Sequence, residues 1–216
     1  MWLLLAGMFG AAVALWPSTP NTIPVHWGVD GTPNGYGSRF EGLMLLPLTA
    51  LALYIIMLFL PRIDPRRESY QSFAGAYMMF RAATMVFLAV LYGATLFSIK
   101  DRPVNITSVA LILVGGLFVV LSRVLGQLRP NWFVGIRTPW TLSSERSWTQ
   151  THQAGGKFFL GAGLLFAIAG IVGTPWAFWV AFACMLAGSI ALVAYSYVVW
   201  KNDPDHHPPG TGIVRG

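Results

Sequence analysis

Six long apolar stretches, separated by shorter polar segments, dominate the chain. They cover residues 1–16, 43–60, 73–97, 106–125, 158–172 and 176–200. A helix that crosses the hydrocarbon core of a bilayer needs about 20 such residues, with a range of roughly 17–25. The first and fifth stretches are short, so we expect them to extend into their flanks or to thin the bilayer locally. The pattern predicts an all-α integral membrane protein with six transmembrane helices.

The composition excludes the other broad classes of protein. Of the 216 residues 55% are hydrophobic and 10% are charged, whereas soluble domains are about 25% charged. A soluble globule of this length could not bury so much apolar side chain, and disordered chains are poor in aromatic residues. The single cysteine, Cys184, excludes an intramolecular disulfide. Residues 1–16 lack the basic region and cleavage site of a signal peptide, so we expect an uncleaved span.

The basic residues predict which side of the membrane each loop faces. Ten of the 14 Lys and Arg lie in or beside the second loop, the fourth loop and the C-terminal tail, and three lie in the first and third loops. Cytoplasmic loops are enriched in Lys and Arg, so both termini are predicted to be cytoplasmic. The thin spread of the +6 charge does not indicate nucleic-acid binding. Three spans in each half would make the halves inverted relative to each other, as in many transporters, although no residue-level repeat supports this.

The spans and loops divide the chain into four segments. Residues 1–60 hold the first two spans and an ordered outer loop (17–42), and residues 61–125 hold spans three and four. Residues 126–200 hold an inner loop (126–157) and the last two spans, and residues 201–216 read as a disordered cytoplasmic tail. Gly163, Ala167 and Gly170 share one face of the fifth helix, where small residues allow close helix packing.

The outer loop is rich in turn-forming residues. Asp30-Gly31 and Asn34-Gly35 are turn dipeptides, and prolines stiffen the path between them. We therefore expect a compact cap with His26 and Trp27 near the membrane interface. Its candidate ligand-binding residues are His26, Trp27, Gly28, Asp30, Gly31, Asn34, Gly35 and Tyr36. The alternative is that the aromatic residues are interfacial anchors and His26 is an ordinary loop residue.

The inner loop holds a second group of polar and aromatic residues. Thr138 followed by Pro139 is a helix-start signature, which predicts a helix that runs from there towards His152. Gly135 offers the unusual backbone that a turn needs, and Arg137 could bind a lipid phosphate or a carboxylate. The candidate residues are Asn131, Gly135, Arg137, Thr138, Pro139, Trp140, Thr141, Glu145, Trp148 and His152. The alternative is an interfacial anchor helix.

Arg81 is the one charged residue predicted deep inside a span, because Arg123 lies at the edge of the fourth span. An intramembrane Arg costs at least a few kcal/mol unless it snorkels to the headgroups or has a partner, so it is a functional candidate. The six predicted spans contain no acidic residue, which argues against a proton-coupled carrier.

Motifs for catalysis and for metal binding fail on inspection. Gly155-Gly156-Lys157 lacks the other residues of a phosphate-binding loop, because Thr151 and Phe158 occupy their places. His26 and His152 are predicted on opposite sides of the membrane. The sequence therefore predicts no catalytic residue, no cofactor and no metal.

The two loops together resemble a known family. Residues 131–140, with the following Thr141, Leu142, Trp148 and His152, resemble the signature of the Sdp toxin-immunity (SdpI) membrane proteins. Residues 23–37 resemble a domain of unknown function that is often found at the start of that family. The motifs cover about a quarter of the chain, and their order and their separation by three spans also match.

The resemblance implies a multi-pass protein of the bacterial cytoplasmic membrane that protects against a secreted killing peptide. It also implies, for part of the family, capture of a small transcriptional repressor at the cytoplasmic face. The expected partners are thus the lipid bilayer, a peptide toxin outside and a repressor inside, with no direct nucleic-acid contact. The peptide would contact the cap at His26 and Trp27, and the inner loop at Arg137, Trp140 and Trp148 would change its exposure. The alternatives are a small-solute, anion or lipid transporter that uses Arg81 and Arg137, and an enzyme for lipid-linked substrates.

Overall fold

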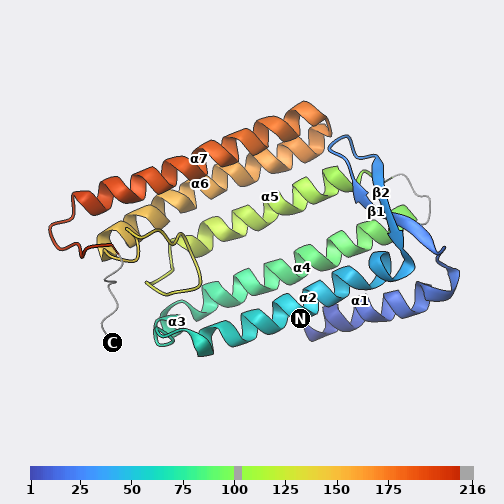
Figure 1. The fold of residues 1–216 in the computed structure, drawn as a ribbon, viewed down its shortest axis with the longest axis horizontal. Coiled ribbons are helices and arrows are strands. Elements are labelled where there is room, and N and C mark those ends of the chain that lie inside the picture. Colours follow the sequence, from blue (N-terminus) through green and yellow to red (C-terminus); the bar gives the residue numbers. More distant parts are fainter. Residues whose placement is uncertain (100–103, 210–216) are drawn as a thin grey trace.

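Long helices lie side by side along one axis in the computed structural model, which describes residues 1–99 and 104–209 (Figure 1). The elements are α1 (Trp2–Leu15), a 3-10 turn η1 (Trp16–Ser18), β1 (Thr22–Trp27), β2 (Pro33–Ser38), α2 (Arg39–Ile63), α3 (Ser69–Ser72), α4 (Ala74–Ile99), α5 (Ile106–Leu125), α6 (Glu145–Val172) and α7 (Pro175–Lys201). Within the described residues, five helices of 20–28 residues are long and apolar enough to cross a membrane. The chain is a multi-pass membrane protein, as predicted.

The first helix is shorter than the other apolar helices. α1 has 14 residues, which corresponds to about 21 Å at 1.5 Å per residue, against about 30 Å for the hydrocarbon core. In Figure 1 its N-terminal end lies partway along the bundle, whereas its C-terminal end lies beside the hairpin. The structure therefore supports five full-length helices and one shorter apolar helix.

The helices form two groups of three that meet at one end of the bundle. α1, α2 and α4 pack around buried residues that include Leu5, Tyr54 and Met85. α5, α6 and α7 pack around a second cluster that includes Leu111 and Phe166. A third cluster joins the groups at the end where α3 lies; it contains Met57, Tyr70, Phe73, Ala76, Tyr77, Val124, Leu125, Leu128 and Trp148.

Glycines hold α5 and α6 close together, as the small-residue face predicted. A Cβ atom on Gly163 would lie 2.7 Å from the carbonyl oxygen of Gly115, and one on Gly170 would lie 2.7 Å from that of Ser108. The two backbones are therefore in direct contact over several turns. In a bilayer such packing replaces the hydrophobic effect as the force between helices.

The outer loop is ordered, and it contains a two-stranded sheet that the all-α prediction lacked. β1 and β2 pair antiparallel, with Thr22 opposite Ser38 and a register shift around His26. β2 reads Pro-Asn-Gly-Tyr-Gly-Ser, and its composition is unfavourable for a strand. The loop also ends earlier than residue 42, because Ser38 caps α2 and forms a capping box with Glu41.

The predicted helix start at Thr138 is wrong. Thr138 instead closes a turn in which its hydroxyl accepts a hydrogen bond from the Thr141 N–H at 3.1 Å. α6 begins at Glu145, with the Ser144 side chain accepting from the Ser147 N–H. Helix α6 then continues without a break to Val172, so the inner loop ends at residue 144 rather than 157. Thr138 carries a capping signature, but the N-cap that starts the long helix is Ser144.

The tail prediction needs a similar correction. Residues 202–209 lie against the inner loop rather than free of the protein: Asp203 is buried and accepts a hydrogen bond from the Ser144 hydroxyl. The His207 N–H donates to the Ser143 carbonyl at 3.0 Å. Residues 210–216 lie outside the described residues.

Candidate functional site

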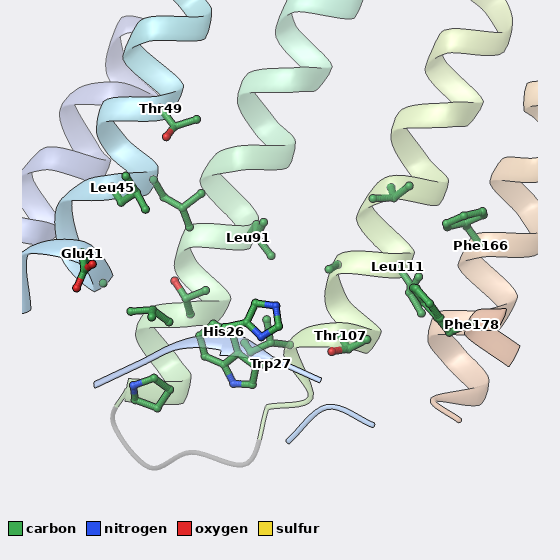
Figure 2. Close-up of a pocket in the computed structure, with 18 residues that line it drawn as sticks. His26, Trp27, Glu41, Leu45, Thr49, Leu91, Thr107, Leu111, Phe166 and Phe178 are labelled. Carbon is green, nitrogen blue, oxygen red and sulfur yellow. The ribbon is translucent and has the colours of Figure 1, made fainter. Parts of the chain in front are cut away.

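An apolar groove of about 560 Å³ lies between the two helix groups at the hairpin end of the bundle. Figure 2 shows strand β1 across its outer end, with α2 and α4 on one side and α5, α6 and α7 on the other. The groove runs inward from Ile106 to Val114 on α5 and from Glu41 to Thr49 on α2. Eight helical residues rise about 12 Å, so the groove has nearly the depth of one hydrocarbon leaflet.

The lining of the groove is mostly apolar. It includes Leu91, Leu111, Phe166 and Phe178, and Thr49 lies at the inner end. Its outer end, near β1, also holds His26, Trp27, Glu41 and Thr107. Known ligand sites are mostly apolar cavities of about 300–1,000 Å³ that carry a few polar groups. This groove fits that description for an amphipathic ligand.

The hairpin is attached to both helix groups. On the first group, Ile23 of β1 is buried, and its side chain contacts Gly42 of α2 so closely that a Cβ there would clash. On the second, the Thr107 hydroxyl of α5 donates a 2.7 Å hydrogen bond to the Gly28 carbonyl. The hairpin therefore bridges the two halves over the mouth of the groove.

Two of the predicted outer residues line the groove, and the others shape the hairpin. His26 and Trp27 line it. His26 Nδ1 donates to the side-chain oxygen of Asn34, and Gly35 opposes His26 across the strands, where a Cβ would lie 2.8 Å from that of His26. Tyr36 is exposed.

The hairpin turn is built by Gly28, Asp30 and Gly31. The Asp30 carboxylate accepts from the backbone N–H and the hydroxyl of Thr32, which lowers the pKa of Asp30. Gly31 has φ +82°, and a side chain there would run into Asn105. These residues hold the turn against the start of α5 rather than facing the groove.

The inner signature residues form a buried hydrogen-bond network far from the groove. The Asn131 amide donates to the Val134 carbonyl at 2.9 Å, and its oxygen accepts from the Val134 N–H at 2.7 Å. Asn131 is 1% exposed, so its role is to fold the loop. Gly135, at φ +117°, turns the backbone directly above the His152 ring, where a side chain would clash.

His152 and Trp148 fix this loop to α6. His152 Nε2 accepts from the Ile136 N–H at 2.9 Å, and its Nδ1 donates to the Trp148 carbonyl at 2.7 Å. This pattern requires the neutral ring. The two rings stack with their centroids 4.1 Å apart, and the Trp148 indole N–H donates to the Leu128 carbonyl at 3.0 Å.

The remaining inner candidates divide into buried and exposed residues. Thr141 is fully buried, and its hydroxyl donates to the Ile136 carbonyl at 2.8 Å. The Thr138 hydroxyl pairs with that of Ser196 on α7, whereas Trp140 packs edge-on against Tyr197. The exposed residues are Arg137, Pro139 and Glu145. Glu145 therefore does not share the buried face of Trp148 and His152.

Asp64, which the sequence reading missed, connects the first half of the protein to this network. Its side chain is 2% exposed and accepts from the Trp132 N–H at 3.1 Å and the Tyr70 hydroxyl at 3.0 Å. Burial and the hydrogen bond to Asp64 raise the pKa of Tyr70. The available signal was an acidic residue within a loop whose other charges are mostly arginines.

Arg81 and Arg137 have different surroundings. The Arg81 guanidinium lies 5.7 Å from the ring centre of Tyr54 on α2. Arg137 donates to the Trp132 carbonyl in the inner loop. Within residues 1–99 and 104–209, no group of three or more His, Cys, Asp or Glu side chains is placed to hold a metal ion.

Comparison with known proteins finds family matches in two segments of the chain. Residues 127–196 match the SdpI/YfhL protein family, and residues 3–61 match a domain of unknown function (DUF1648). The chain is also similar to the immunity protein SdpI of Bacillus subtilis (strain 168). The two are 22% identical over 160 residues, which is 74% of each chain. No solved structure matches the chain significantly. The predicted resemblance to the SdpI family, with its N-terminal domain of unknown function, is confirmed.

Proposed function

We propose that the protein is a membrane immunity protein that binds a membrane-active peptide in the groove below the hairpin. The observation that carries the proposal is its alignment with the immunity protein SdpI over 74% of the chain. Immunity against a peptide that attacks the bilayer needs a binding site that such a peptide can reach from the membrane. The groove provides an apolar surface at the depth of one leaflet.

Polar groups at the mouth give the ligand an orientation. An apolar segment of the peptide would pack against Leu91, Leu111 and Phe178, because each buried methylene group contributes about 0.8 kcal/mol. The polar end of the segment would meet His26 and Glu41 at the outer end. An amphipathic ligand is therefore held in one direction, with its polar end outward.

The arrangement also offers a route from the groove to the inner loop. The two helix groups line the groove at one end of the bundle. At the other end they pack together in the cluster around Tyr70, Leu128 and Trp148. A peptide that fits the groove best when the groups are slightly separated would favour that arrangement of the bundle. This separation would strain the hydrogen bond between Asp64 and Trp132, which connects the two helix groups at the α3 end.

Protection of a toxin-sensitive host tests the proposal. Cells that express the wild-type protein should survive an Sdp-type peptide better than cells without it. Ala110→Phe fills the groove and should abolish this gain, whereas Ala183→Phe, on the exposed face of α7, should preserve it. Unchanged survival with wild-type protein at verified membrane levels would contradict immunity. Full protection by Ala110→Phe would contradict the use of the groove.

A second proposal concerns a small repressor at the inner face. Trp132 and Phe133 are 36% and 39% exposed beside the exposed Arg137, and this surface can contact a protein, whereas Trp148 is 1% exposed and cannot. A repressor encoded beside this gene should co-purify with the wild-type protein and be lost from Phe133→Ser. Equal recovery with both proteins would contradict this surface.

A further inference from the structure

Arg81 lies within the membrane without a hydrogen-bonding partner among the described residues. It is the eighth residue of α4, which begins at Ala74, so it lies about 10 Å along the helix from that end. Its Nε atom is buried and makes no hydrogen bond. No carboxylate in residues 1–99 and 104–209 forms an ion pair with it, and Asp64 at the same end of the bundle already accepts from Tyr70 and Trp132.

The Arg81 guanidinium lies beside an aromatic ring of α2. Its central carbon lies 5.7 Å from the ring centre of Tyr54 on α2. Tyr54 is 6% exposed and makes an edge contact with Trp2 of α1 at 5.0 Å. The charge therefore lies between α4 and α2, beside the Tyr54 ring. A cation at membrane depth is costly unless its charge reaches the headgroup layer or pairs with an anion.

We propose that Arg81 binds the phosphate group of a phospholipid in the leaflet at the α3 end of the bundle. The planar guanidinium donates to two phosphate oxygens at once, which a compact ammonium does not do. The phosphate is an anion that is present throughout the headgroup layer, and a long Arg side chain brings its charge towards that layer. This inference does not depend on the proposed immunity function.

Arg62 provides a matched comparison within the same chain. It also stacks on an aromatic ring, that of Phe59, at 5.3 Å, and it lies near the same end of the bundle. Unlike Arg81, it is exposed in the last turn of α2. Water can therefore solvate Arg62, so its loss should not remove a bound lipid.

Native mass spectrometry of the purified full chain tests the site. Wild-type protein should retain one phosphatidylglycerol molecule, and it should bind diacylglycerol with the same acyl chains at least about tenfold more weakly, because diacylglycerol lacks the phosphate. Arg81→Gln should weaken phosphatidylglycerol binding at least about tenfold. Arg81→Lys should recover part of it, and Arg62→Gln should leave it unchanged.

Three outcomes would overturn the proposal. Equal binding of the two lipids by wild-type protein would show that the acyl chains alone are bound, and this comparison holds even where Arg81→Gln fails to fold. Equal loss in Arg62→Gln would show a general effect of surface charge. Displacement of the lipid by millimolar inorganic phosphate would assign the site to free phosphate instead.

Discussion

At the scale of single residues, several signature residues of the inner loop form hydrogen bonds that stabilise the loop itself. His152 accepts from one backbone group and donates to another, and Asn131 satisfies both sides of a turn with one amide. A buried donor or acceptor that loses its partner costs about 1–3 kcal/mol. Folding of the loop therefore explains why His152 and Asn131 are needed at these positions, without any contact to a ligand.

His152→Ala should lower the free energy of unfolding by at least about 2 kcal/mol. The change leaves the Ile136 N–H without its acceptor and removes a ring stacked on Trp148. Thermal unfolding of the protein in nanodiscs measures the effect. The neighbouring Gln153→Ala, at an exposed position, is the control and should change little. A His152→Ala protein as stable as the control would contradict a role of His152 in stabilising the inner loop.

At the scale of elements, the bundle depends on how closely its helices approach. α5 and α6 touch through glycines, whereas α4 and α5 leave room for the groove near the hairpin. The groove therefore lies between α4 and α5, where the two helix groups are separated, and not between the tightly packed α5 and α6.

Gly163→Ala should destabilise the protein by about 1–3 kcal/mol, because its Cβ would lie 2.7 Å from the Gly115 carbonyl oxygen and the helices must separate. Gly161→Ala lies on the same helix, with no atom within 4 Å of the added Cβ, and should be neutral or slightly stabilising. Denaturation of both variants in nanodiscs compares them. Equal stability would contradict direct backbone contact.

The elements also show what the sequence could reveal. Hydropathy located the long helices because each needs a continuous apolar run, and Gly163 and Gly170 marked a packing face through their spacing. The sequence could not locate the start of α6, because Thr138 and Ser144 both carry side chains that can cap a helix. Tertiary contacts decide between them. The sequence also could not show the groove or the role of Asp64, since both depend on segments that are distant in the sequence.

At the scale of the whole molecule, two connections join the halves at opposite ends. The hairpin connects them at one end through Ile23 and the Thr107–Gly28 hydrogen bond, and Asp64 connects them at the α3 end through Trp132. The groove lies between the halves beneath the hairpin. Any ligand that changes their separation therefore acts on both connections.

Thr107→Val should loosen the hairpin without unfolding the bundle. Loss of the 2.7 Å hydrogen bond to Gly28 costs about 0.5–1.5 kcal/mol, which raises amide exchange in Thr22–Trp27 by up to about tenfold. Thr84→Val removes a hydroxyl that bonds only within its own helix and is the control. Hydrogen-exchange mass spectrometry compares the two. Unchanged exchange in Thr107→Val would contradict the bridging role.

The predicted orientation places the hairpin outside the cell and the inner loop in the cytoplasm. In a Cys184→Ala background, Tyr36→Cys should react with an impermeant thiol reagent in intact cells, because Tyr36 is 64% exposed on the hairpin. Thr149→Cys, exposed near the start of α6, should react only after the cells are opened. Labelling of both from the same side would contradict this topology.

The most direct measurement of the central claim is photocrosslinking of an Sdp-type peptide to the protein in membranes. A photoreactive amino acid in place of Leu91 faces the groove, whereas one in place of Leu186 lies on the exposed face of α7. The account predicts a crosslink at position 91 that is lost in Ala110→Phe, and little at position 186. Equal crosslinking at both positions, or a crosslink at 91 that survives Ala110→Phe, would contradict binding in the groove.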